Sequence, residues 1–137
     1  MSSTLIDLTA PSITMRFIIG VTFNPTFFVL GAANSIVDLS GYKAKMQARV
    51  NLSDAEPATG FDLTTENGGL SIVTGTASTQ AGTVVLNAQG VQVNVPSSVT
   101  NAVAWTRAYF GIRLIAPDLS IIPLIEGLLV PQLDAIR

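Results

Sequence analysis

The stretch Val37-Asp38-Leu39-Ser40-Gly41-Tyr42-Lys43-Ala44-Lys45-Met46-Gln47-Ala48-Arg49-Val50 combines a turn signal with the clearest two-residue alternation in the chain. Successive side chains of a β-strand point to opposite faces of the sheet. One face here carries Tyr42, Ala44, Met46, Ala48 and Val50, and the other carries Lys43, Lys45, Gln47 and Arg49. The stretch therefore predicts a half-buried strand of an antiparallel sheet, entered through the small and flexible pair Ser40-Gly41.

Composition excludes several kinds of chemistry. The chain has 137 residues, which fits one domain, and it has no cysteine and no histidine. Disulfides, thiolate metal sites and histidine-based catalysis are therefore excluded. Charged residues make up only 12% of the chain against 48% hydrophobic residues. A domain with so few charges has surplus apolar surface, and contact with another chain is the ordinary way to bury it.

Neither a membrane span nor a nucleic-acid partner is expected. Arg113, Pro117, Pro123, Glu126 and Pro131 interrupt the longest apolar stretches before they reach the length of a membrane-spanning helix. The first residues also lack the basic start and apolar core of a signal peptide. A formal net charge of −2 provides no broad attraction to phosphates.

Alternating segments and turn signals recur along the whole chain. Long strands are predicted from Ile13 onward, over Ala104–Ile115 and over Ile121–Val130, and Asn67-Gly68 predicts a hairpin turn. One short helix is predicted near Ser97–Val103. We therefore expect an all-β fold, an antiparallel β-sandwich with at most one short helix. Its predicted boundaries are an N-terminal arm at 1–12, the sandwich at 13–131 and a C-terminal tail at 132–137.

No catalytic site is predicted. Without histidine or cysteine, nucleophilic catalysis would need a serine or threonine activated by a lysine or a carboxylate. The closest carboxylate pairs are Asp54 with Glu56 and Asp62 with Glu66, and both pairs fall in segments that read as solvated loops. The expectation is that the protein is not an enzyme and uses no cofactor, metal or small-molecule substrate.

Two surfaces are candidates for binding. Trp105 and Tyr109 fall on one face of the predicted strand 104–115, where they either form a sugar-stacking or protein-anchoring patch or pack inside the fold. The final strand is apolar on both sides, which predicts that part of it meets a neighbouring chain. The candidate assembly-interface residues are Trp105, Tyr109, Ile121, Ile125 and Leu129. The basic stripe of Lys43, Lys45 and Arg49 is interpreted as a solubilising strand face.

Three segments together resemble a known family. Asp38–Arg49 resembles the pattern D-L-T-G-Y-x-A-x-x-Q-x-R of small β-sandwich proteins of tailed bacteriophages, including the amino-terminal domain of baseplate upper proteins. Thr64–Ile72 is similar to the hairpin that follows this pattern in the family, and Leu124–Pro131 is similar to its closing strand. The resemblance covers about residues 13 to 137.

The resemblance implies a non-enzymatic virion protein that joins tail, baseplate, fibre or neck components through protein–protein contacts. Its expected partners are other virion structural proteins and further copies of itself, and its expected location is the virion, after assembly in the host cytoplasm. The alternatives are a capsid decoration protein and a carbohydrate-binding or adhesin module that would use the Trp105 and Tyr109 face.

Overall fold

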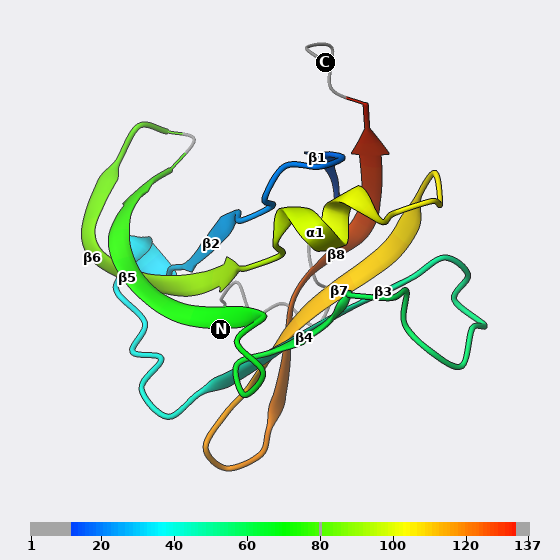
Figure 1. Ribbon diagram of the computed structural model, residues 1–137. Helices are drawn as coiled ribbons and strands as arrows, with labels where there is room; N and C mark the ends of the chain where they lie inside the picture. The colour runs from blue at the N-terminus through cyan, green and yellow to red at the C-terminus, as the bar shows by residue number, and fades with distance from the viewer. Residues whose placement is uncertain (1–11, 80, 134–137) are drawn as a thin grey trace.

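The computed structural model describes residues 12–79 and 81–133, which form two β-sheets packed face to face (Figure 1). The predicted all-β sandwich with one short helix is confirmed. The described elements in chain order are β1 (Ser12–Ile18), β2 (Thr26–Val29), the 3-10 turn η1 (Ala32–Asn34), β3 (Lys43–Arg49), β4 (Asp62–Thr64), β5 (Leu70–Ser78), β6 (Val84–Val93), α1 (Ser97–Asn101), β7 (Ala108–Ile115) and β8 (Ile121–Gln132).

The larger sheet has five strands in the order β1-β8-β7-β3-β4. Three of its four pairings are antiparallel, but β1 runs parallel to β8, from Ser12 beside Glu126 to Ile18 beside Gln132. The predicted antiparallel sandwich therefore contains one parallel pair, which the sequence did not indicate. Parallel neighbours need a long connection, and almost the whole chain lies between β1 and β8.

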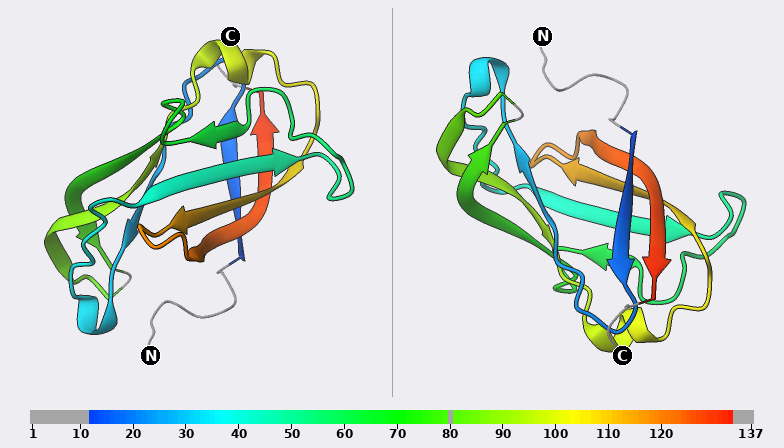
Figure 2. Two further views of the ribbon diagram at one scale, coloured as in Figure 1. Left: turned by 90° about the horizontal axis from the view of Figure 1, so that it is seen from below. Right: turned by 90° about the horizontal axis from the view of Figure 1, so that it is seen from above.

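The smaller sheet has the order β2-β6-β5 and covers one face of the larger sheet (Figure 2). The side chains of β3 alternate as predicted for residues 42–50, with one set facing the smaller sheet and the other facing away from it. Ala44, Met46 and Ala48 are buried, whereas Lys43 is exposed and Lys45 and Arg49 are half-exposed. Tyr42 and Val50, which belong to the same face of the predicted strand and were expected to face the interior, are only partly buried because they stand just outside the two ends of β3. Tyr42 nevertheless packs against the core.

Aromatic side chains form one end of the core. Phe17 of β1 lies with its ring centroid 5.4 Å from that of Phe23 and 5.9 Å from that of Phe61. Trp105 meets both Phe17 and Phe61 edge-on, at centroid distances of 5.9 and 5.5 Å. Tilted and edge-on pairs of this kind add stability beyond the area they bury.

The helix α1 lies at one end of the sandwich, near the end of β8 (Figure 2). Thr100 ties the helix to the chain after β1. Its hydroxyl accepts from the Gly20 N–H at 3.2 Å and lies 2.9 Å from the carbonyl oxygen of Val21, to which it donates. Thr100 is the only fully buried polar side chain among the described residues. The predicted helix near Ser97–Val103 is confirmed, as α1. The hydroxyl group of Thr100 fixes the position of this helix against the chain after β1.

Replacing Thr100 with valine should lower the free energy of unfolding by about 1–2 kcal/mol, because the hydrogen bonds are lost at unchanged side-chain shape. Thermal denaturation followed by circular dichroism measures this loss. Thr100→Ser keeps the hydroxyl and is the matched control, which should lose less stability. Equal melting temperatures for Thr100→Val and the unmodified protein would contradict this role of the hydroxyl.

Three local predictions need correction. The turn at Asn67-Gly68 forms, but it does not close a hairpin, because β4 pairs with β3 and β5 pairs with β6 in the other sheet. The predicted strand 104–115 begins only at Ala108. Strand β1 includes Ser12 and β8 includes Gln132, two residues that were predicted to lie in the arm and the tail. Leu133 of the predicted tail follows β8, and the rest of the arm and tail, residues 1–11 and 134–137, lies outside the described residues.

Candidate functional site

The candidate site is the face of the five-stranded sheet that points away from the smaller sheet, here called the outer face. Pairing and burial place alternate residues of β3, β7 and β8 on it. Its central members are Lys43, Lys45, Gln47, Arg49, Tyr109, Gly111, Arg113, Ile115, Ile121, Pro123, Glu126 and Leu128. In the described part of the chain, no second sheet or helix covers this face (Figures 1 and 2).

The outer face collects most of the positive charge of the protein. It carries five of the seven lysine and arginine residues, of which Arg16 comes from β1 and Arg113 from β7. Its strands contribute only two carboxylates, those of Asp62 and Glu126. The face therefore has three net positive charges in a chain whose formal net charge is −2. This asymmetry favours an acidic binding partner.

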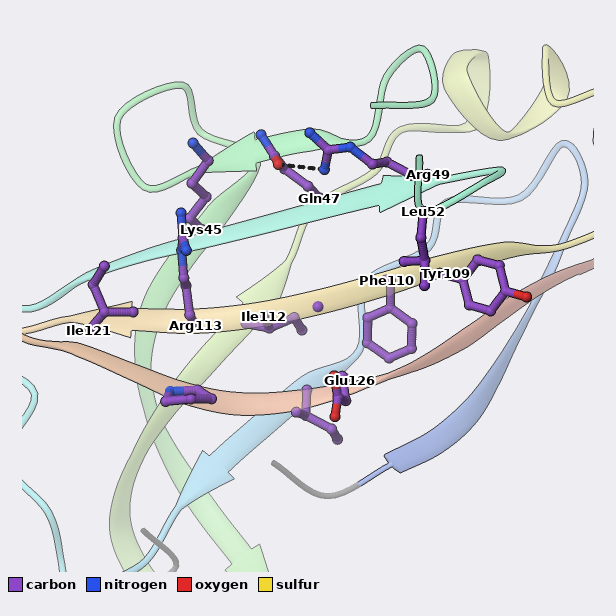
Figure 3. A pocket seen from close by; sticks show the side chains of 13 residues that line it. Lys45, Gln47, Arg49, Leu52, Tyr109, Phe110, Ile112, Arg113, Ile121 and Glu126 are labelled. Carbon is purple, nitrogen blue, oxygen red and sulfur yellow. Dashed lines mark hydrogen bonds between the residues drawn. The ribbon is translucent and has the colours of Figure 1, made fainter. Parts of the chain in front are cut away.

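A hollow of about 390 Å³ lies in the middle of the outer face (Figure 3). Gly111 lies among the residues that line it, and its neighbours across the sheet are Gln47 on β3 and Glu126 on β8. Figure 3 shows Arg113 reaching up beside Lys45, its pairing partner on β3. Apolar lining comes from Leu52, Ile121, Pro123 and Ile125, with Tyr109 at one end.

Hydrogen bonds hold one wall of the hollow in place. Arg49 donates from Nη1 to Oε1 of Gln47 at 2.8 Å and from Nε to the carbonyl oxygen of Asp54 at 3.1 Å. Gln47 in turn donates to Oδ1 of Asp62 at 3.0 Å. These bonds fix the guanidinium of Arg49 and the loop that carries Leu52. A binding surface fixed in this way loses less conformational entropy on association.

The two predicted aromatic candidates do not share a face. Tyr109 lies on the outer face and lines the hollow. Trp105 precedes β7 and packs half-buried against Phe17 and Phe61. The prediction of one Trp105 and Tyr109 patch is wrong, because the strand alternation does not extend back beyond Ala108.

Of the three candidates in the final strand, only Ile121 points outward. Ile121 is 57% exposed and lines the hollow. Leu129 is fully buried beside Ala108, so its assignment to an assembly interface is wrong. Ile125 is partly buried against the core beside Ile112 and borders both this hollow and a second one, of about 530 Å³, beside β2.

An irregularity in the pairing of β7 with β8 explains why Ile121 points outward whereas Ile125 and Leu129 point toward the core. The register shifts between Ile112 and Arg113, which pair with Ile125 and Pro123. The extra residue, Leu124, places both Ile122 and Ile125 on the core side, which a strict two-residue alternation does not allow. Ile121, Ile125 and Leu129 would share one face only if the alternation of the strand were unbroken.

Sequence reasoning missed Gly111 and Leu119. Gly111 interrupts the alternation of an otherwise regular strand, and a glycine inside a strand indicates a bulge or the close approach of another molecule. Leu119, in the turn between β7 and β8, has a positive φ of 71° and is 78% exposed. Nothing in the local sequence predicts that conformation for a leucine.

The chemistry available at the outer face is recognition of a carboxylate beside an apolar group. Lysine and arginine side chains flank the hollow, and arginine can bind a carboxylate through two parallel hydrogen bonds. Among the described residues, no cluster of three or more histidine, cysteine, aspartate or glutamate residues could hold a metal ion. In the same residues, no helix has the length and hydrophobicity needed to cross a membrane.

Comparison of the chain with protein-family models gives no match, and comparison with curated proteins gives none.

Proposed function

We propose that the protein is a non-enzymatic structural component that binds other proteins through its outer face. The setting that the sequence resemblance implies is the virion of a tailed bacteriophage, where the protein joins tail, baseplate, fibre or neck components. Its partners in this proposal are other virion proteins and further copies of itself. The same surface chemistry would serve a capsid decoration protein.

The observation that carries this proposal is the combination of exposed apolar side chains and fixed cations on a sheet face that no other described element covers. Ile121 and Leu52 are largely exposed beside the hollow, and Arg49 is held by two hydrogen bonds at its wall. Protein interfaces combine an apolar centre with arginine and tyrosine anchors, and both residue types are present here.

The carbohydrate-binding alternative has less support. It relied on Trp105 and Tyr109 as a shared stacking platform, and Trp105 instead packs against the phenylalanines of the core. Tyr109 alone remains on the outer face, next to aliphatic side chains that offer sugar rings no flat surface.

Incorporation into particles tests the proposal. In particles purified from the phage whose genome encodes the chain, the unmodified protein should be present at a constant copy number. Ile121→Lys should be lost from the particles, because it adds another cation to an already cationic face and removes an apolar contact. Its melting temperature should change little, because the side chain is largely exposed.

Leu86→Lys is the matched control for this substitution. Leu86 is 65% exposed and lies on β6 of the smaller sheet, so the change is chemically alike but lies outside the outer face. This variant should enter particles like the unmodified protein. Absence of the unmodified protein from particles, or normal incorporation of Ile121→Lys, would refute the proposal.

A further inference from the structure

The glycine at position 111 is not required by the fold. A Cβ atom built on Gly111 would meet nothing within 4 Å, and its φ lies outside the left-handed region. The other three glycines inside strands face close neighbours: the Phe28 ring at Gly75, the Phe27 carbonyl oxygen at Gly90 and the Ile13 carbonyl oxygen at Gly127. Glycine inside a strand lowers the stability of the sheet. A larger side chain would therefore be expected at position 111 unless the hollow is kept open to bind another molecule.

The leucine at position 119 is not required by the fold either. Leu119 lies at the tip of the β7–β8 turn, with its side chain in solvent and its backbone in a conformation that favours glycine or asparagine. The other described non-glycine residues with a positive φ are Ala33, Asn34 and Asn87, and two of these three are asparagine. Strained backbone of this kind clusters at functional sites, so an exposed leucine at this position suits a contact residue.

The turn that carries Leu119 is a rigid projection. The N–H of Leu119 donates to the Ala116 carbonyl oxygen at 2.8 Å, and the N–H of Ala116 donates to the Ser120 carbonyl oxygen at 2.9 Å. Asp118 accepts from the Ser120 N–H at 2.9 Å, and its hydrogen bonds with the Ser120 side chain and backbone lower the pKa of this carboxyl. Figure 1 shows the turn projecting beyond the other strands at the bottom of the view.

The projection and the hollow are complementary in charge and polarity. The turn presents the carboxylate of Asp118 next to the apolar side chain of Leu119. The hollow offers the three cations Lys45, Arg49 and Arg113 against one carboxylate, Glu126, next to apolar side chains, and its 390 Å³ is ample for one leucine side chain and a carboxylate. Opposite charges and matched apolar groups are the features that select a protein partner.

We propose that the β7–β8 turn of one copy binds in the hollow over Gly111 of a second copy. Leu119 packs over Gly111, and Asp118 faces Lys45 and Arg113. The inference rests on the proposed function, for which it names a second copy of the chain as one partner. Each copy carries both the projection and the hollow, so two copies can bind each other reciprocally in a two-fold dimer, or many copies can join head-to-tail in a ring or an open filament.

Sedimentation velocity of the purified protein over a wide concentration range tests the contact. The mass of the unmodified protein should rise with concentration, and the rise should weaken at high salt, which screens Asp118 from the cations. Gly111→Val fills the hollow, and Leu119→Asn removes the projecting side chain. Each should weaken self-association by about 30-fold, as expected for the loss of an interface hot spot.

Neither variant should unfold the protein. Valine suits an exposed strand position with open space around it, and asparagine suits a positive φ, so both melting temperatures should equal or exceed that of the unmodified protein. A melting curve for each variant excludes misfolding as the cause of lost association.

An equal mixture of the two variants gives the sharpest result. The Gly111→Val copy retains its projection and the Leu119→Asn copy retains its hollow, so the mixture should form a one-to-one dimer and no larger species. Unmodified protein that stays monomeric at every concentration, or a mixture that does not pair, would overturn the inference. If the unmodified protein were monomeric in solution but still entered particles, the contact between copies would be refuted and the proposed virion function would stand. If it self-associated but were absent from particles, only the virion function would be refuted.

Discussion

Met46→Asp should leave the protein largely unfolded at room temperature. Met46 is fully buried in the middle of β3, between Leu63 of β4 and Ile112 of β7. An aspartate there would place an unpaired carboxylate among apolar side chains, at a cost of about 3–5 kcal/mol, in addition to the lost burial of methionine. A domain of this kind has a total stability of roughly 5–15 kcal/mol. Urea denaturation followed by circular dichroism measures the loss.

Lys43→Asp is the control for this substitution, because it introduces the same side chain into the same strand on the outer face. Lys43 is exposed, so its replacement should change stability by no more than about 0.5 kcal/mol. If Met46→Asp unfolded at the same urea concentration as the unmodified protein, the register of β3 would be wrong by one residue.

Gly127→Ala should have the second largest effect, a loss of about 2–4 kcal/mol. Gly127 lies in β8 between β1 and β7, with a φ of 153°, and a Cβ atom there would overlap the carbonyl oxygen of Ile13. That oxygen belongs to the backbone, so the parallel pairing of β1 with β8 would have to open, and overpacking of this kind costs 1–3 kcal/mol or more. Thermal denaturation would show a melting temperature lowered by roughly 10 °C.

Gly111→Ala is the matched control, since it adds the same methyl group to the neighbouring strand where nothing lies within 4 Å. Its melting temperature should stay the same or rise slightly, because alanine restricts the unfolded chain more than glycine does. A similar loss of stability in both variants would show that the close approach of Ile13 to Gly127 is absent in solution.

For β3, sequence alone could predict which face each side chain takes, but it could not predict which strands become neighbours. The alternation in residues 42–50 correctly placed Met46 in the core and Lys43 in solvent. The parallel pairing of β1 with β8 depends on the arrangement of the whole chain, and no local pattern in either strand indicates it.

The candidate site was predicted only in part because one extra residue changed the alternation of the final strand. The irregularity at Leu124 turned Ile125 and Leu129 toward the core and left Ile121 outside, although all three belong to one apolar stretch. The hollow was not predicted because it needs Lys45 of β3 beside Arg113 of β7, and these residues become neighbours only in the folded sheet.

Lysine reactivity offers the most direct test of the claim that the outer face is an assembly surface. Lys43 and Lys45 are the only lysines of the chain, and both lie on β3 at this face. Particles and the free protein released from them are treated with the same amine-acetylating reagent, and modification of each lysine is measured by mass spectrometry. The amine that Leu86→Lys introduces on the smaller sheet serves as the internal reference. We expect Lys45 to react several times more slowly in particles than in the free protein, while the reference amine reacts equally in both. Equal reactivity of Lys45 in the two states would show that the outer face is not an assembly surface.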